Sequence, residues 1–362
     1  MTEAVQNVVP ASDGETALEY EAVRGGGAGL FDLSARGRIE VSGGEAVQFL
    51  NGMLTNDMEK FEEGTWKHAA FPNPQGRLLA STRVLKRDSA FLFDTEAATY
   101  PNILKHLERF TLAGDFRVRD LTDETALLSV QGARASEFVG AVLGEEAATT
   151  TRGRITRASF GEGEVTIIRA THTSEDGFDL FVDAGVAESL RDALVKAGAR
   201  PVGLDALEVL RVEAGVPRYG VDASDANVVL EVVDEAEAVS YTKGCYAGQE
   251  IIARIHWRGH VAKRLTGIIL EDDAEPPADA RLRDSAEGRE AGRITSSVFS
   301  PRLNARVALA LVKYDFLAPG TELKVFSGDT EVCAARVAEL PLVRGSWYAQ
   351  AEGEQAQAGE AE

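Results

Sequence analysis

The chain has 362 residues, 44% of them hydrophobic, which is enough to build the cores of two or three domains. Its 38 basic and 58 acidic residues give a formal charge of −20. This charge argues against direct nucleic-acid binding, which relies on clustered Lys and Arg, although an ordinary solvated acidic surface gives the same value. The sequence contains no apolar run long enough to span a bilayer.

Two cysteines, Cys245 and Cys333, lie far apart in the sequence. They are too few for a secreted disulfide scaffold, and the first residues show no hydrophobic leader. We therefore expect free thiols in a cytoplasmic protein.

The sequence divides into four predicted regions. Residues 1–17 lack apolar periodicity and residues 348–362 are acidic and low in complexity, so both are expected to be disordered tails. Strand and helix patterns mix over residues 18–262, whereas residues 263–347 contain short apolar runs separated by turn residues. Residues 263–347 are therefore predicted to form an all-β C-terminal domain.

Periodicity predicts individual elements within residues 18–262. In chain order these are a strand over 38–41, a helix after Gly44, a hairpin over 78–93, a helix opened by Pro101, strands over 164–169 and 178–182, and helices over 186–197 and 205–214. Asp205 is expected to cap the last of these helices. Residues 251–257 alternate between apolar and polar side chains, which indicates a short strand.

The segment Tyr241-Thr-Lys-Gly-Cys-Tyr-Ala-Gly-Gln-Glu-Ile251 is the densest candidate for chemistry. Gly244 and Gly248 allow a sharp bend around Cys245, and Lys243 places a cation two residues from the sulfur. A helix beginning near Gly248 would add positive potential from its N-terminal amides, and both effects favour the nucleophilic thiolate. A small, buried, apolar cysteine beside a glycine turn fits the same pattern, so the residues alone leave both interpretations open.

Two other groups of polar residues give weaker signals. His256 and His260 are four residues apart, as in a helical metal pair, but no further Cys or His cluster completes a site, so we expect solvated histidines and no metal. Three carboxylates lie around Gly177, the last of them Asp179. A carboxylate at a strand edge could pair with two N–H donors of a heterocycle such as a pterin, and an ordinary acidic hairpin turn is the alternative.

Several segments match a known family. Lys243-Gly-Cys-Tyr-Ala-Gly-Gln-Glu250, followed by Arg254 and Trp257-Arg-Gly-His260, resembles the signature of YgfZ-type folate-binding proteins. Four more segments resemble landmarks of the wider aminomethyltransferase superfamily, which includes the glycine cleavage T-protein: Gly29-Leu-Phe-Asp-Leu-Ser34, Phe49-Leu-Asn-Gly-Met-Leu-Thr-Asn-Asp57, Asn73-Pro-Gln-Gly-Arg77 and Gly292-Arg-Ile-Thr-Ser-Ser-Val-Phe-Ser-Pro301. Together they cover roughly residues 25–345.

The resemblance implies an α+β fold in which three domains form a ring around a central folate pocket. These are an antiparallel β/α domain, a ferredoxin-like domain interleaved with it in sequence, and a C-terminal β-barrel-like domain. The first two together make up the predicted folate-binding region, residues 18–262. Tetrahydrofolate or a one-carbon derivative is the implied cofactor.

The resemblance also implies roles for single residues. Asp179 stands at the position of a pterin-binding Glu, Arg211 at that of an arginine lining the pocket, and His172 at that of a tyrosine in folate-domain oxidases. Within the signature segment, Cys245 and Lys243 are the implied catalytic residues. The remaining cofactor-binding candidates come from the same segment and are Tyr246, Gln249 and Glu250.

One departure from the T-protein pattern concerns the reaction. T-proteins carry an aspartate pair four and five residues after the glycine of Asn73-Pro-Gln-Gly76, where this sequence has Ala80 and Ser81. Neither residue can stabilise a cationic amine or position a proton as a carboxylate does. This departure argues against aminomethyl transfer and favours a protein that is not an enzyme.

The function implied by the resemblance is that of a tetrahydrofolate-binding accessory protein for iron–sulfur protein assembly or repair, linked indirectly to tRNA modification. Cys245 would carry out thiol chemistry, since a lone cysteine cannot hold a cluster that normally needs about four ligands. The expected partners are folate and iron–sulfur client or assembly proteins, without nucleic acid or membrane, and we expect a monomer. A folate-dependent one-carbon (aminomethyl) transferase is the alternative.

Overall fold

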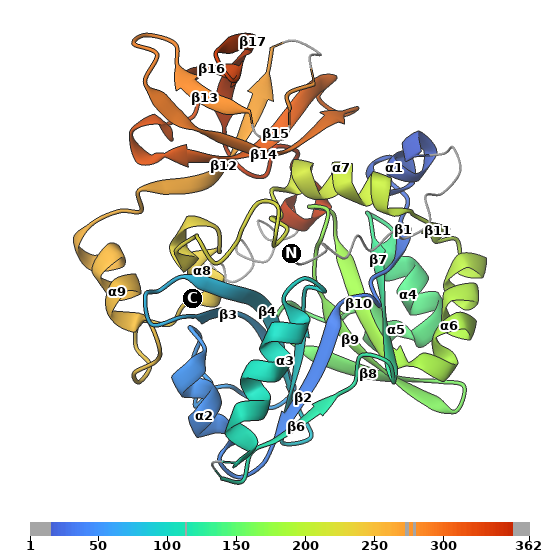
Figure 1. The fold of residues 1–362 in the computed structure, drawn as a ribbon. Helices are drawn as coiled ribbons and strands as arrows, with labels where there is room; N and C mark the ends of the chain where they lie inside the picture. The colour runs from blue at the N-terminus through green and yellow to red at the C-terminus, as the bar shows by residue number, and fades with distance from the viewer. Residues whose placement is uncertain (1–15, 113, 272–274, 278–279, 350–362) are drawn as a thin grey trace, which may run out of the picture.

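The computed structural model describes residues 16–112, 114–271, 275–277 and 280–349. In these ranges a six-stranded sheet, a five-stranded sheet and a closed six-stranded barrel surround the centre of the molecule (Figure 1). Of the predicted tails, only residues 16–17 and 348–349 are described, and both pairs are helical. No helix in the described ranges has the length and apolar character needed to cross a membrane.

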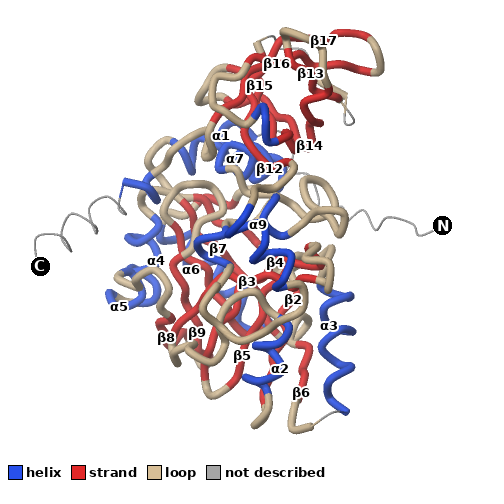
Figure 2. Tube along the Cα trace, turned by 90° about the vertical axis from the view of Figure 1, so that its left-hand side faces the viewer, coloured by secondary structure: helices blue, strands red, loops and turns tan. Residues whose placement is uncertain are grey.

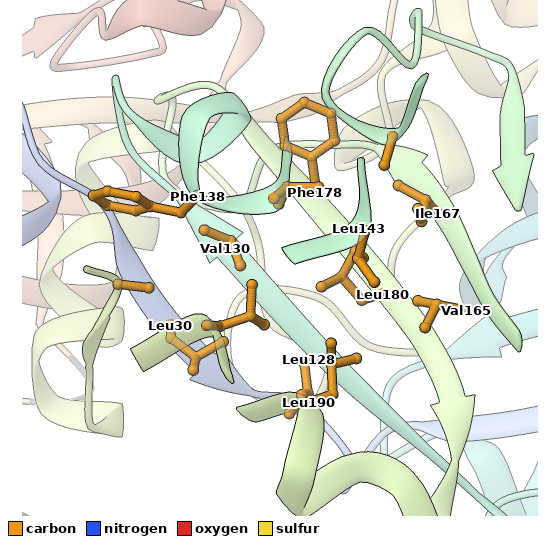
Figure 3. Packing of buried hydrophobic residues seen from close by; sticks show 14 of the residues in the cluster. Leu30, Leu128, Val130, Phe138, Leu143, Val165, Ile167, Phe178, Leu180 and Leu190 are labelled. Atoms are coloured by element: carbon orange, nitrogen blue, oxygen red, sulfur yellow. The ribbon is translucent and has the colours of Figure 1, made fainter. Parts of the chain in front are cut away.

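The six-stranded sheet has the strand order β11-β1-β7-β10-β9-β8. Its strands span Arg200–Pro201 (β11), Gly29–Asp32 (β1), Thr125–Gln131 (β7), Gly177–Asp183 (β10), Gly163–Arg169 (β9) and Ile155–Phe160 (β8). Three helices cover one face: α4 (Ala135–Leu143), α5 (Glu145–Ala148) and α6 (Ala184–Ala197). Alternate strand residues meet Phe138 of α4 and Leu190 of α6 in the core between these layers (Figure 3).

The five-stranded sheet has the order β3-β4-β5-β2-β6. It comprises β3 (Thr65–Pro72), β4 (Leu78–Arg87), β5 (Ala90–Thr95), β2 (Gly37–Ser42) and β6 (Arg117–Asp120), packed against α2 (Ala46–Met53) and α3 (Tyr100–Glu108), which continues into η1 (Arg109–Leu112). The predicted hairpin is confirmed, and its turn residues Asp88 and Ser89 have φ values of 54° and 61°. Because β2–β6 are inserted between β1 and β7, the two sheets are interleaved in sequence, as expected.

The C-terminal domain is all-β, as predicted. Its strands close in the order β12-β15-β14-β13-β16-β17 and span Lys263–Leu270 (β12), Arg281–Asp284 (β13), Glu290–Ser300 (β14), Ala305–Lys313 (β15), Glu322–Ser327 (β16) and Thr330–Ala338 (β17), with η3 (Tyr314–Phe316) after β15. Figure 2 shows this barrel at one end of the molecule, beyond α7. The α+β fold with a C-terminal barrel is thus confirmed.

Two helices lie between the six-stranded sheet and the barrel: α1 (Thr16–Arg24) and α7 (Leu204–Ala214). The buried carboxylate of Glu213 on α7 accepts hydrogen bonds from Tyr20 and Arg24 of α1 and from Ser300 of β14. The predicted capping role of Asp205 is wrong, because α7 begins one residue earlier and Gly203 is its N-cap.

The segment after the cysteine motif is helical. The short helix α8 (Glu235–Ala238) follows η2 (Val229–Glu231), and α9 (Gln249–Arg258) then begins directly after Gly248. The strand predicted over 251–257 is therefore wrong. His256 of α9 bonds to Glu235, whereas His260 lies beyond the helix and stacks on Tyr314. Among the described residues, no group of three or more His, Cys, Asp or Glu side chains could hold a metal ion.

Candidate functional site

A cavity of about 1000 Å³ lies where the three β units meet. Its lining comes from β3, β4, the loop before β10, α7, the segment between α7 and α8, the first residues of β12 and the segment after β17. The aromatic and charged members of the lining include Trp66, His68, Arg83, Glu96, His172, Arg218, Tyr219, Arg264, Trp347 and Tyr348. A concave site of this size, apolar with convergent polar groups, suits a ligand as large as a cofactor.

Buried charges join the two sheets beneath this cavity. Arg36 and Arg83 both bond to Asp94 of β5, with Nε–Oδ distances of 2.7 Å from each arginine. Arg83 also donates across the sheets to Asp179 of β10, whose Oδ2 lies 2.9 Å from Nε2 of His172. The chain of contacts therefore runs from Arg36 through Arg83 to His172, and all three of these residues line the cavity.

This network fixes the charge of its members. Burial alone would raise the pKa of Asp94, but the guanidinium groups of Arg36 and Arg83 lower it to about 2. Burial is likewise outweighed at Asp179, where His172 and Arg83 hold the carboxyl pKa below its ordinary value.

His68 lies outside this network. Burial is the largest effect on it and, with the charge of Arg83, lowers the pKa to about 4, so the ring is neutral at pH 7.

Two predicted folate ligands, Asp179 and His172, lie at the cavity, one behind its surface and one in its lining. Asp179 is fully buried and does not line the cavity, whereas its partner His172 does. Because Asp179 is held by Arg83 and His172, these two side chains form the cavity surface in front of it. Its direct contact with a pterin stays a prediction.

Arg211 lines the cavity but its guanidinium is fully engaged. It donates to Glu208 on the same helix, to Asp222 at 2.5 Å and to Ser296 of β14 at 2.6 Å. These bonds tie α7 to the barrel. In this arrangement Arg211 shapes the wall and has little hydrogen-bonding capacity left for a ligand.

The sequence led us to expect that the Lys243 cation acts on the Cys245 sulfur, but its hydrogen bonds are made elsewhere. Its buried ammonium group donates to the backbone carbonyls of Asn51, Leu54 and Asn56 at 2.8, 2.6 and 2.7 Å. Burial lowers the pKa of Lys243 to about 8, opposed by Asp57 and Glu59, so the ammonium form still predominates at pH 7. Lys243 therefore fixes the chain that leaves α2.

The rest of the signature segment lies outside the cavity lining. Cys245 is exposed, Glu250 pairs with Arg254 on the surface of α9, and Gln249 starts that helix. Tyr246 is buried, with the Lys243 ammonium 4.9 Å from its ring centre. None of these residues belongs to the lining, so the structure does not bring Cys245 or the cofactor-binding candidates Tyr246, Gln249 and Glu250 to the cavity.

A glycine contact explains the shape of this segment. Gly248 has φ of +77°, and a Cβ there would lie 2.4 Å from the carbonyl oxygen of Asn73 and 2.9 Å from Gly76. Asn73-Pro-Gln-Gly76 and the cysteine segment thus pack backbone to backbone, although they are far apart in sequence. Gly248 is required by this packing, and Gly76 by its own φ of +70°.

The two positions that lack the T-protein aspartates face opposite ways. Ala80 is buried in the core between the five-stranded sheet and α2, whereas Ser81 lines the cavity. Sequence reasoning missed most of the other lining residues. Asp94 did give a signal, since it is a charged residue after the apolar run Ala90–Phe93 of β5, and the lining residue Arg83 is its cross-strand partner.

Comparison with known proteins defines the family. The GCVT N-terminal domain matches residues 10–233, and the glycine cleavage T-protein C-terminal barrel domain matches residues 263–344. The chain belongs to the glycine cleavage T-protein family.

Full-length relatives agree with this family. An aminomethyltransferase from Rubrobacter xylanophilus is 32% identical over 328 residues, covering 90% of this chain and 86% of the relative. One from Thermus thermophilus is 32% identical over 298 residues, covering 82% of each chain. The crystal structure of the glycine cleavage system aminomethyltransferase T from Bartonella henselae superposes with a TM-score of 0.80 at 24% identity, covering 91% of this chain and 90% of that one, and shows the same fold.

The separation of Cys245 from the cavity gives a direct prediction for this T-protein family member. A thiol reagent should modify Cys245 in the native protein and leave the buried Cys333 unmodified. Saturating tetrahydrofolate should change the rate at Cys245 by less than about twofold, because a ligand in the cavity does not cover the sulfur. Rates measured by mass spectrometry check this, and strong protection by folate would place the sulfur in the folate site after all.

Proposed function

We propose that this T-protein family member binds a reduced folate in its central cavity and acts in folate-dependent one-carbon transfer. The observation that carries the proposal is the cavity itself, whose size and mixed aromatic and polar lining fit such a ligand. The curated relatives that share about a third of its residues are aminomethyltransferases. This proposal replaces the accessory role that the sequence favoured, since Cys245 does not share the cavity.

The lining offers suitable partners for each part of a folate. Neutral His68 and the Asp179-bound His172 can hydrogen-bond to pterin N–H and carbonyl groups. Trp347 lines the cavity with Arg152 stacked against its ring at 3.7 Å, and can stack on an aromatic part of the ligand. Arg264 lines the cavity where the barrel begins and can pair with a glutamate carboxylate.

Folate, when bound, supplies the nitrogen atoms that carry a one-carbon unit. The chain's own contribution is to bind and orient the folate, because all three β units contribute residues to the lining. The carboxylate that T-proteins place on the β4 wall is missing at Ser81.

An anaerobic calorimetric titration with tetrahydrofolate tests the binding step. We expect saturable 1:1 binding, weakened about tenfold or more in His172→Ala because a cavity-lining hydrogen-bonding group is lost. The matched control is His260→Ala, which removes a histidine that stacks on Tyr314 outside the cavity lining and should leave the affinity unchanged. Absence of binding, or equal effects of the two substitutions, would refute the proposed site.

A second candidate is the YgfZ-type accessory role in iron–sulfur protein assembly or repair, with an indirect link to tRNA modification. The exposure of Cys245 favours it, because an exposed thiol in an unusual segment can meet a client protein. Cys245→Ser separates the two functions. Loss of iron–sulfur enzyme activity in the host, with folate binding intact and no one-carbon transfer in a turnover assay with tetrahydrofolate and an aminomethyl donor, would favour the accessory role.

A further inference from the structure

Glu96 puts a carboxylate on the same cavity wall that lacks the T-protein aspartates. It follows β5 directly, and the hydroxyl of the preceding residue, Thr95, donates to the backbone carbonyl of Ser81 at 3.3 Å. Glu96, Ser81 and Thr82 all line the cavity. The carboxylate therefore reaches the cavity from the strand next to the one that carries Ser81.

The charge of Glu96 is not neutralised within the described part of the chain. Its Oε2 accepts one hydrogen bond, from the backbone N–H of Tyr219 at 2.8 Å, and no ion pair joins it to another described residue. Arg36, whose charge acts on Glu96, is committed to Asp94 through two hydrogen bonds of 2.7 and 2.9 Å. A largely buried carboxylate without a cationic partner favours an incoming positive charge.

The other acidic residues of the lining differ from Glu96 in this respect. Glu208 is paired with Arg211 and Arg218, and Glu237 lies 3.5 Å from His68 with most of its side chain exposed. Asp234 caps α8 by accepting from the backbone N–H of Ala236. Glu231 accepts a hydrogen bond from Asn227 at 2.8 Å and lies 4.0 Å from the Lys263 ammonium group. Glu96 is thus the lining carboxylate whose position and pairing both suit a cationic ligand.

We propose that Glu96 binds the protonated primary amine of a one-carbon donor beside the folate, in place of the carboxylate missing at Ser81. This assignment rests on the proposed function and adds to it the residue of this chain that holds the donor's cation. A carboxylate there would contact the ammonium group directly, so Glu96 contributes to binding and orientation of the donor in the cavity.

The pH dependence of ammonium binding gives the inference a second test. Burial raises its carboxyl pKa, and the neighbouring carboxylates of Asp94 and Asp222 act in the same direction, whereas Arg36 and the Tyr219 N–H oppose them. The carboxylate form therefore increases as pH rises through this raised value. Binding of an ammonium ion should strengthen with it, since the amine itself stays protonated below about pH 9.

Methylammonium is the probe for the test, titrated into the full-length protein saturated with tetrahydrofolate and followed by saturation-transfer NMR. We expect binding that strengthens from pH 5 to pH 8 and that falls at least tenfold in Glu96→Gln, which keeps the acceptor for Tyr219 N–H and loses the charge. The matched control, Glu237→Gln, removes another lining carboxylate and should change the affinity less than twofold.

Two outcomes would overturn the inference: Glu96→Gln binds methylammonium as the unaltered protein does, or the folate-loaded protein binds none. Tetrahydrofolate affinity is measured on the same samples and should stay within about threefold in Glu96→Gln. If the unaltered protein fails to bind tetrahydrofolate, the proposed function itself fails. If folate binds and methylammonium does not, only the role of Glu96 is rejected.

Discussion

Replacing Arg83 with methionine is expected to lower the free energy of unfolding by about 3–5 kcal/mol, because it leaves two buried carboxylates without their shared cation. Arg83 bonds to both Asp94 and Asp179, each with its side chain fully buried, and is itself almost fully buried between the two sheets. The same change should weaken tetrahydrofolate binding, since it removes a lining side chain and the contact that holds Asp179 in place behind His172. Urea unfolding and folate titration measure the two effects.

The control for Arg83 is Arg157→Met. Arg157 pairs with Asp88 at the surface, where such a pair contributes less than about 1 kcal/mol. The effect of Arg83→Met should also depend on pH. The pKa of Asp94 is lowered from 3.8 to about 2 in the folded protein, so the stability from this pairing is present above pH 3.8 and is lost as pH falls through about 2. Equal losses at both arginines would contradict the account.

Lys243→Met should destabilise the fold by about 4 kcal/mol without making Cys245 less reactive. The substitution removes three hydrogen bonds from a buried ammonium group and leaves the carbonyls of Asn51, Leu54 and Asn56 unsatisfied, at a cost of about 1–3 kcal/mol for each buried group. Urea unfolding measures the loss of stability, and the pH profile of thiol alkylation measures the sulfur.

The matched substitution for Lys243 is Cys245→Ser. It changes an exposed side chain in the same segment and should alter stability by less than about 0.5 kcal/mol. A Lys243→Met protein of normal stability with a slowly reacting thiol would show that the lysine acts on the sulfur, as its spacing in sequence suggested.

Elements with strong periodicity were predictable from the sequence. The hairpin of β4 and β5, the helix α2 and the all-β character of the chain after residue 263 follow from apolar spacing and turn residues, whereas the barrel was implied by the family resemblance. The helix α9 was mistaken for a strand because alternation over seven residues resembles one. The close packing of Gly248, just before this helix, against Asn73 and Gly76 joins distant segments, and no local pattern predicts it.

The candidate site was less predictable than the fold, because it depends on contacts between segments that are distant in sequence. Lys243 and Cys245 are two residues apart, yet the lysine side chain turns into the protein while the cysteine is exposed. The residues that form the cavity come together across sheets, as Arg83 of β4 meets Asp179 of β10. Such contacts depend on how the two sheets pack, which local sequence patterns do not encode.

The measurement that tests the central claim most directly is a crystal structure of the protein grown with tetrahydrofolate. We expect the pterin ring in the cavity between β4 and the loop before β10, within hydrogen-bonding distance of His172 or His68. Folate bound at the surface beside Cys245, or a cavity that stays empty at saturating folate, would contradict it.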